Sequence, residues 1–270
     1  MRMSLQQSTR ATRASWSRLG VWAGWVLLAL VSMNPSAWAE DTPGATSDPA
    51  AAPAKEGDGP WSGNVSLGYL ATTGNTETTN ANFGFEVDYA INRWTHGLKG
   101  SAIGASDDND TTSEAYSVSW KSLYDLSERN YLFGRARWLK DRFSSYDQQV
   151  SEAVGYGRRL ILQPHQNLTV EIGPGARQSE LQDGEELNET ILWLGASYEY
   201  QFNESAQLNF DLGVQAGEDN TFTEGILGLK TKLVGALAAV LAYTVRSNTD
   251  VLDDSEKTDT ITSISLEYSF

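Results

Sequence analysis

The 270-residue sequence contains no cysteine and only two histidines. Without cysteine, the chain can form neither disulfide bonds nor thiolate metal sites. Beyond residue 60 it also lacks the 3.6-residue apolar period that marks amphipathic helices. These absences exclude disulfide-stapled scaffolds, zinc-thiolate folds and helical bundles, so the fold has to be built from strands.

The first 39 residues have the organisation of a cleaved secretory signal peptide. Four arginines precede an apolar run over residues 19–33. This run is shorter than the roughly 20 apolar residues that a membrane-spanning helix needs. Ala37-Trp38-Ala39 then supplies small residues on either side of a cleavage position before Glu40. An uncleaved N-terminal anchor is the alternative.

Removal of this segment makes the chain strongly acidic. The segment holds four of the 20 basic residues and no acidic one, so 16 basic and 35 acidic residues remain, a net charge of −19. Such a surface repels phosphates, and nucleic acid is therefore not expected as a partner. Residues 40–60 are rich in Ala, Pro, Gly and Asp and have no apolar period. We expect them to form a disordered periplasmic leader.

The last thirteen residues alternate apolar and polar side chains. One face carries Thr260, Thr262, Ile264, Leu266, Tyr268 and Phe270. A period of two indicates a strand, and the closing strand of an outer-membrane barrel presents such a face to lipid. Leu266, Tyr268 and Phe270 also resemble the terminal signal that the bacterial barrel-assembly machinery reads. An edge strand of a soluble sandwich is the alternative.

Similar alternation recurs through the rest of residues 61–270 and predicts twelve strands. The pattern is weakest over residues 150–162 and 221–233. We expect a single all-β domain, a monomeric antiparallel up-and-down transmembrane β-barrel whose even strand count returns both ends to one side. Short connections are expected on the periplasmic side. Long acidic ones, over residues 106–112, 180–189, 218–220 and 249–259, are expected outside.

Four stretches of the predicted barrel resemble one bacterial family. They are Trp61-Ser62-Gly63-Asn64-Val65-Ser66-Leu67-Gly68, Thr73-Gly74-Asn75-Thr76-Glu77-Thr78, Asn82-Phe83-Gly84 and Leu266-Glu267-Tyr268-Ser269-Phe270. The family is a domain of unknown function whose members are labelled salt-induced outer membrane proteins. The resemblance covers nearly all of residues 61–270 and implies an outer-membrane location. It implies no chemistry, only expression that responds to salt.

The predicted strand phases divide the charged and aromatic residues between two faces. The inward face is expected to carry the candidate lumen-lining residues Glu86, Asp88, Lys121, Arg135, Arg137, Glu171, Glu199, Asp211 and Glu267. The outward face is expected to carry aromatics near the strand ends, as an interfacial girdle would, with a platform for sugars as the alternative. Twelve strands leave more interior room than eight. The interior is then either a narrow pore selecting small solutes or a closed scaffold of neutralising ion pairs.

Catalytic and metal sites are not expected. A lipid-acting barrel enzyme needs a nucleophile, a histidine base and an orienting group near the outer edge of the membrane. His96 and His165 are both expected on the periplasmic side instead. The acidic clusters at residues 107–110 and 253–254 could attract divalent cations but lack the spacing of a calcium loop.

The sequence therefore predicts a non-enzymatic, exported outer-membrane barrel without cofactors. A narrow pore for small solutes or ions, active in adaptation of the envelope to osmotic or ionic stress, is the favoured function. Membrane lipids, lipopolysaccharide and the barrel-assembly machinery are the expected partners. The alternatives are a closed structural barrel, a barrel hydrolase of lipid or peptide, and a soluble periplasmic binding sandwich.

Overall fold

The computed structural model describes residues 59–72, 78–107, 110–142, 144–252 and 256–270. The expected signal peptide lies outside these residues, as do the expected leader up to residue 58, most of the Thr73–Thr78 stretch and the acidic pair at 253–254. Within the described ranges, no helix has the length and apolar character needed to cross a membrane.

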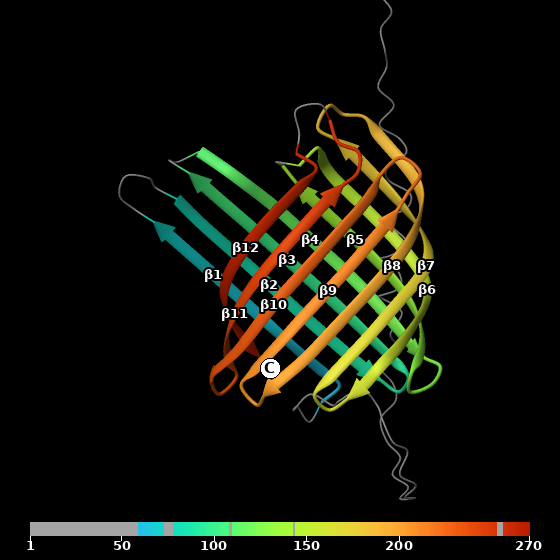
Figure 1. Cartoon of the computed structure of the whole chain (residues 1–270), viewed down its shortest axis with the longest axis vertical. Helices are drawn as coiled ribbons and strands as arrows, with labels where there is room; N and C mark the ends of the chain where they lie inside the picture. The colour runs from blue at the N-terminus through green and yellow to red at the C-terminus, as the bar shows by residue number, and fades with distance from the viewer. Residues whose placement is uncertain (1–58, 73–77, 108–109, 143, 253–255) are drawn as a thin grey trace, which may run out of the picture. The chain divides into compact units, whose positions relative to one another are not determined.

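Twelve antiparallel strands form one closed barrel in which each strand pairs with its sequence neighbours and β1 pairs with β12 (Figure 1). The strands are β1 (Trp61–Thr72), β2 (Thr78–Ile91), β3 (Trp94–Asp107), β4 (Asp110–Asp125), β5 (Asn130–Asp141), β6 (Tyr146–Gln163), β7 (Gln166–Leu181), β8 (Glu186–Asn203), β9 (Ala206–Ala216), β10 (Thr221–Val234), β11 (Leu237–Asn248) and β12 (Thr258–Ser269). The predicted fold class, a twelve-stranded antiparallel barrel, is confirmed.

The period of two in the sequence becomes the two faces of the barrel wall. On β8, Leu192 and Leu194 are exposed on the outside, whereas the alternating residues Ile191 and Trp193 are buried inside. The same alternation continues across the register partners Val214 and Leu212 on β9. Large apolar side chains exposed all along the outside, with charged residues such as Glu171 and Arg177 buried inside, are the opposite of what a soluble protein shows.

Connections at the two ends of the barrel differ in length, though less than the sequence predicted. One end, called here the short-turn end, has the turns at residues 92–93, 126–129, 164–165, 204–205 and 235–236. The other, the loop end, has connections at 142–145, 182–185, 217–220 and 249–257. The expected long connections over 106–112 and 180–189 were wrong, because β3, β4, β7 and β8 continue through most of these residues.

Inward aromatics lie over glycines of the neighbouring strands. A Cβ atom on Gly157 would come within 2.2 Å of the Tyr131 ring, its register partner. A Cβ atom on Gly213 would lie 2.6 Å from the Trp193 ring. Glycine at these positions therefore leaves the space that the two rings fill.

The closure between β1 and β12 is much shorter than the other strand pairings. Registered pairs run only from Asn64↔Ser269 to Leu67↔Leu266, whereas β1 pairs with β2 over its full length. Phe270 extends the closure by exchanging two backbone hydrogen bonds with Gly63, of 2.9 and 3.0 Å. The barrel is thus sealed at the short-turn end of this seam.

Candidate functional site: a divided barrel interior

A chain of ion pairs crosses the barrel interior near the loop end. Arg137 on β5 makes a bidentate pair with Glu224 on β10, with two N···O distances of 2.8 Å. Arg246 on β11 contacts Glu224 at 2.8 Å and reaches Asp141 on β5 at 3.3 Å. Strands β5 and β11 lie on opposite sides of the barrel order. The bridge formed by these four residues therefore connects opposite walls and divides the interior into two lobes.

The lobe enclosed by β5 to β10 is packed with side chains. Tyr131, Phe133, Ala153 and Trp193 form a buried cluster. The guanidinium of Arg135 lies 3.4 Å from the centre of the Trp193 ring, a cation–π contact. Aromatic rings and a stacked arginine leave this packed lobe little room for solute.

Glu171 is the buried acid of the packed lobe. Its carboxylate accepts hydrogen bonds from the Tyr131 hydroxyl at 2.8 Å and from Nε1 of Trp193 at 3.4 Å. Lys121 adds an ion pair at 2.5 Å. A buried carboxylate requires such compensation for its lost hydration.

The other lobe, enclosed by β11, β12 and β1 to β5, is lined by small polar residues and is called here the open lobe. Its polar inward positions are Asn64, Ser66, Asn82, Ser101, Ser117, Ser263 and Ser265, none of which is fully buried. The apolar Ile103, Val240 and Ile261 share the same inward faces. Lys99 pairs with Glu86 at 2.9 Å, yet 62% of the lysine side chain remains exposed. Short side chains and an exposed inward lysine indicate solvent-accessible space in this lobe.

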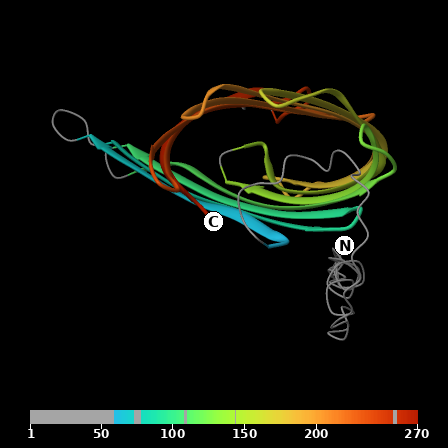
Figure 2. The same ribbon diagram turned by 90° about the horizontal axis from the view of Figure 1, so that it is seen from below.

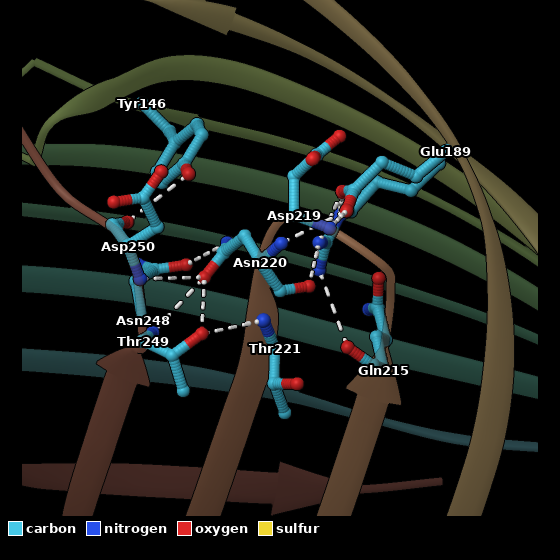
Figure 3. A network of polar contacts seen from close by, with 10 residues as sticks. Tyr146, Glu189, Gln215, Asp219, Asn220, Thr221, Asn248, Thr249 and Asp250 are labelled. Atoms are coloured by element: carbon cyan, nitrogen blue, oxygen red, sulfur yellow. Dashed lines mark hydrogen bonds and ion pairs between the residues drawn. The ribbon is translucent and has the colours of Figure 1, made fainter.

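Asn220 is the centre of a hydrogen-bond network at the loop end (Figure 3). Its side-chain oxygen accepts hydrogen bonds from the backbone N–H groups of Thr249 and Asp250, and its amide nitrogen donates to Asn248. The Tyr146 hydroxyl donates to the carbonyl oxygen of Asp250 from the start of β6. The network therefore ties the β11–β12 connection to strands on the opposite wall.

Glu189 on β8 and Arg177 on β7 extend this network to two further strands. The Glu189 carboxylate accepts from the backbone N–H groups of Asp219 and Asn220 at 2.9 Å, while Arg177 pairs with its other oxygen. The outward neighbours of Glu189 are the exposed polar Asn188 and Thr190, so this part of β8 lies beyond the apolar belt. Burial opposes ionisation of Glu189, but the hydrogen bonds from Asn220 and Arg177 outweigh it and hold the pKa below its usual value.

The remaining candidate lumen residues lie toward the short-turn end. Glu267 pairs with Lys230, and Asp211 accepts a hydrogen bond from the Ser197 hydroxyl. Glu199 is the register partner of Asn209 and Asn167, and Asp88 is that of Gly97. Whether these positions line a conducting path stays a prediction.

The two histidines lie at the short-turn end, where the sequence placed them. His96 shares a 2.8 Å hydrogen bond with Ser122 and stacks on Trp94 with 5.7 Å between ring centres. His165 occupies the exposed β6–β7 turn. Among the described residues, no three His, Cys, Asp or Glu side chains are grouped so as to hold a metal ion.

Sequence reasoning missed Glu224, Arg246 and Asp141 of the bridge, and Arg177 and Glu189 of the network. Strand β10 has glycines on both faces and a mixed pattern, so its phase was ambiguous. Arg177 and Glu189 lie where both faces of the strands are polar, which erases the alternation. Placing Glu189 needed the pairing of Arg177 with it across β7 and β8.

Comparison with known proteins identifies relatives by sequence and likenesses by fold. Residues 65–270 match the family model described as "Protein of unknown function, DUF481". The chain is 28% identical over 211 residues to the uncharacterized protein YdiY of Escherichia coli (strain K12), covering 78% of this chain and 83% of YdiY.

Two solved structures are similar at low sequence identity. The COG4313 outer membrane channel from Pseudomonas putida F1 matches with a TM-score of 0.48 and 12% identity, covering 83% of this chain and all of that one. The NanC porin matches with a TM-score of 0.44 and 11% identity, covering 77% of this chain and 97% of that one.

Proposed function

We propose a function for this chain on the premise that it belongs to the DUF481 family of proteins of unknown function. The chain forms a non-enzymatic barrel of the outer membrane, and its open lobe is a narrow passage for small charged solutes. A role in adaptation of the envelope to salt or osmotic stress is part of the proposal and rests on the family resemblance alone.

The outer surface of the barrel supports the membrane location. Apolar side chains such as Leu67, Ile172, Leu194 and Ile264 project outward from strands all around the wall. A monomeric soluble protein rarely exposes contiguous apolar patches above a few hundred Å². A hydrophobic band closed around a barrel is instead the surface that a bilayer covers.

The single observation that carries the passage is the contrast between the two lobes. One lobe is filled by the Tyr131 and Trp193 rings, and the other is lined by hydroxyl and amide groups with an exposed Lys99. The bridge forms the boundary between them. Its ion pairs keep the passage narrow by holding the opposite walls of β5 and β11 together.

The test is conductance in a planar bilayer with the full-length protein purified from membranes in detergent. The double variant Arg137→Ala/Asp141→Ala removes both contacts that cross the interior and leaves net charge unchanged. The Arg246–Glu224 pair on neighbouring strands survives, so neither buried charge is left without its partner. We expect discrete steps in the wild type and steps several-fold larger in the double variant.

The matched control is Lys140→Ala/Asp147→Ala. This pair, 3.0 Å apart, belongs to the same strand region, but Lys140 lies on the opposite face of β5 from Asp141. The control variant should keep wild-type conductance. Identical steps in the wild type and the bridge variant would contradict a passage bounded by the bridge. Absence of steps from both, in a folded barrel, would favour a closed structural barrel.

A further inference from the structure

The β1–β12 seam is unpaired over its loop-end half. Beyond the Leu67↔Leu266 pair, the backbone of β1 continues for five residues and that of β12 for eight, and no registered pair joins them in the described residues. The last close approach is at Gly68, where a Cβ would lie 2.2 Å from the Ile264 carbonyl oxygen. Both strands remain fully paired with their other neighbours, β2 and β11. The two halves of the wall thus continue as sheets while separating from each other.

The separation of β1 from β12 is visible in both views of the barrel (Figures 1 and 2). Figure 1 shows β1 and its neighbours diverging from β12 toward the loop end. Figure 2, viewed from below, shows the first strands extending past the edge of the ring that β11 and β12 complete. The loop-end half of the seam is therefore a break in the strand pairing of the barrel wall, called here the seam opening.

This opening lies at the level of the apolar belt. Leu67, Tyr69 and Ile264 flank it on the outside and are 63%, 72% and 60% exposed. Val154 and Ile172, outward on strands that are paired on both sides, are similarly exposed, at 63% and 51%. The outer face beside the seam is therefore as apolar and as exposed to the bilayer as the rest of the belt.

Behind the opening lies the open lobe. Ser263 and Ser265 on β12 are inward positions beside the unpaired seam, and Ile261 follows them on the same face toward the loop end. Ser66 on β1, the register partner of Glu267, and Asn82 on β2 lie next to them. A molecule at this opening therefore meets hydroxyl and amide groups inside and hydrocarbon outside. Unpaired strand edges also cannot face hydrocarbon without a hydrogen-bonding partner, because the bilayer core holds no water to satisfy their backbone groups.

We propose that the loop-end half of the β1–β12 seam is a lateral portal that admits the headgroup of a membrane lipid into the open lobe. The acyl chains stay in the bilayer, against Leu67, Tyr69 and Ile264. The polar headgroup bonds the free strand edges and the serine hydroxyls. The portal rests on the proposed membrane location and does not require that the barrel conduct ions.

The absence of native cysteine makes the portal testable by disulfide locking. Residues 69 and 264 would face each other if the register continued, so Tyr69→Cys/Ile264→Cys closes the seam. Leu67→Cys/Leu266→Cys joins a pair already in register and serves as the matched control. We expect the control disulfide to form several-fold faster under the same oxidant. Equal rates would show a seam already closed and would overturn the proposal.

The second measurement follows the lipid itself. The full-length protein is reconstituted in phosphatidylcholine vesicles that contain a headgroup-diazirine phosphatidylcholine, irradiated, digested and mapped by mass spectrometry. We expect adducts on the inward residues Ser66, Ser263 and Ser265. The 69–264 lock should reduce these adducts at least several-fold, reductant should restore them, and the 67–266 lock should leave them unchanged.

Two results would overturn the proposal. One is adducts confined to outward residues in the unlocked protein, and the other is inner adducts that persist in the 69–264 lock. Cross-linking of a co-purified polypeptide in place of lipid would likewise contradict it and assign the free edges to strand addition. Vesicle flotation and heat-modifiable migration on gels establish folding and membrane insertion independently. A failure of the membrane location is therefore distinguishable from a failure of the portal.

Discussion

At the residue scale, the packed lobe depends on large aromatic side chains that each lie over a glycine, which has no side chain. Trp193 carries the cation–π contact with Arg135 and donates a hydrogen bond to Glu171, so its position fixes two charged groups. The ring can occupy that position because Gly213 on the neighbouring strand has no Cβ. The glycine is therefore as necessary to the packing as the tryptophan.

Gly213→Ala should destabilise the barrel. The new Cβ would lie 2.6 Å from the Trp193 ring, and overpacking of this kind typically costs ~1–3 kcal/mol. Gly225→Ala on β10 is the matched control, because a Cβ there has no atom within 4 Å. Urea unfolding in detergent, followed by tryptophan fluorescence, should show a lower midpoint for Gly213→Ala alone. Equal midpoints for the two variants would refute this account of the glycine.

Asn220→Ala should loosen the loop end. The substitution removes the hydrogen bonds that Asn220 accepts from the backbone N–H groups of Thr249 and Asp250 and the one that it donates to Asn248, leaving Thr249 only the Thr221 carbonyl oxygen. Each lost hydrogen bond costs ~0.5–1.5 kcal/mol. Limited proteolysis should cut the β11–β12 connection faster than in the wild type. The control is Asn203→Ala, which removes similar bonds from an exposed turn at the other end of the barrel. Faster cleavage in both variants would mean that Asn220 has no special role.

At the scale of the strand, prediction from sequence worked where the two faces meet different solvents. Leu192, Leu194 and Tyr198 face the outside and Trp193 faces the interior. The alternation in the β8 sequence therefore predicts correctly which residues point inward. Prediction from sequence failed where both faces of a strand contact water. The end of β7 and the start of β8, which lie within residues 180–189, are mostly polar on both faces and were mistaken for a connection.

The same limit explains what could be predicted of the site. Alternation alone identified Arg137 as a candidate interior residue, because it follows from the phase of one strand. Its partner Glu224 lies 87 positions away. Which charges meet across the barrel depends on strand order, tilt and the flattening of opposite walls onto each other, and no local pattern encodes these. The unpaired seam is equally invisible, because both of its strands alternate normally.

At the scale of the whole molecule, the asymmetry of the two ends leads us to expect that the loop end faces the cell exterior. Long strands such as β6 and β8 extend beyond the apolar belt at the loop end, whereas the short-turn end carries tight turns, including Asn92 with a φ of 53°. Membrane barrels have short periplasmic turns and longer elements outside. Both chain ends of the barrel then lie on the periplasmic side.

This orientation predicts which engineered cysteines react in intact cells. Asp183→Cys places a thiol in the exposed β7–β8 turn of the loop end, and Glu204→Cys places one in the exposed β8–β9 turn of the short-turn end. A membrane-impermeant maleimide should label Asp183→Cys at once, and Glu204→Cys only after the outer membrane is permeabilised. The native chain has no cysteine, so it provides the blank. The reverse labelling pattern would show that the loop end faces the periplasm. The seam opening would then lie in the inner leaflet, where phospholipid headgroups face the periplasm.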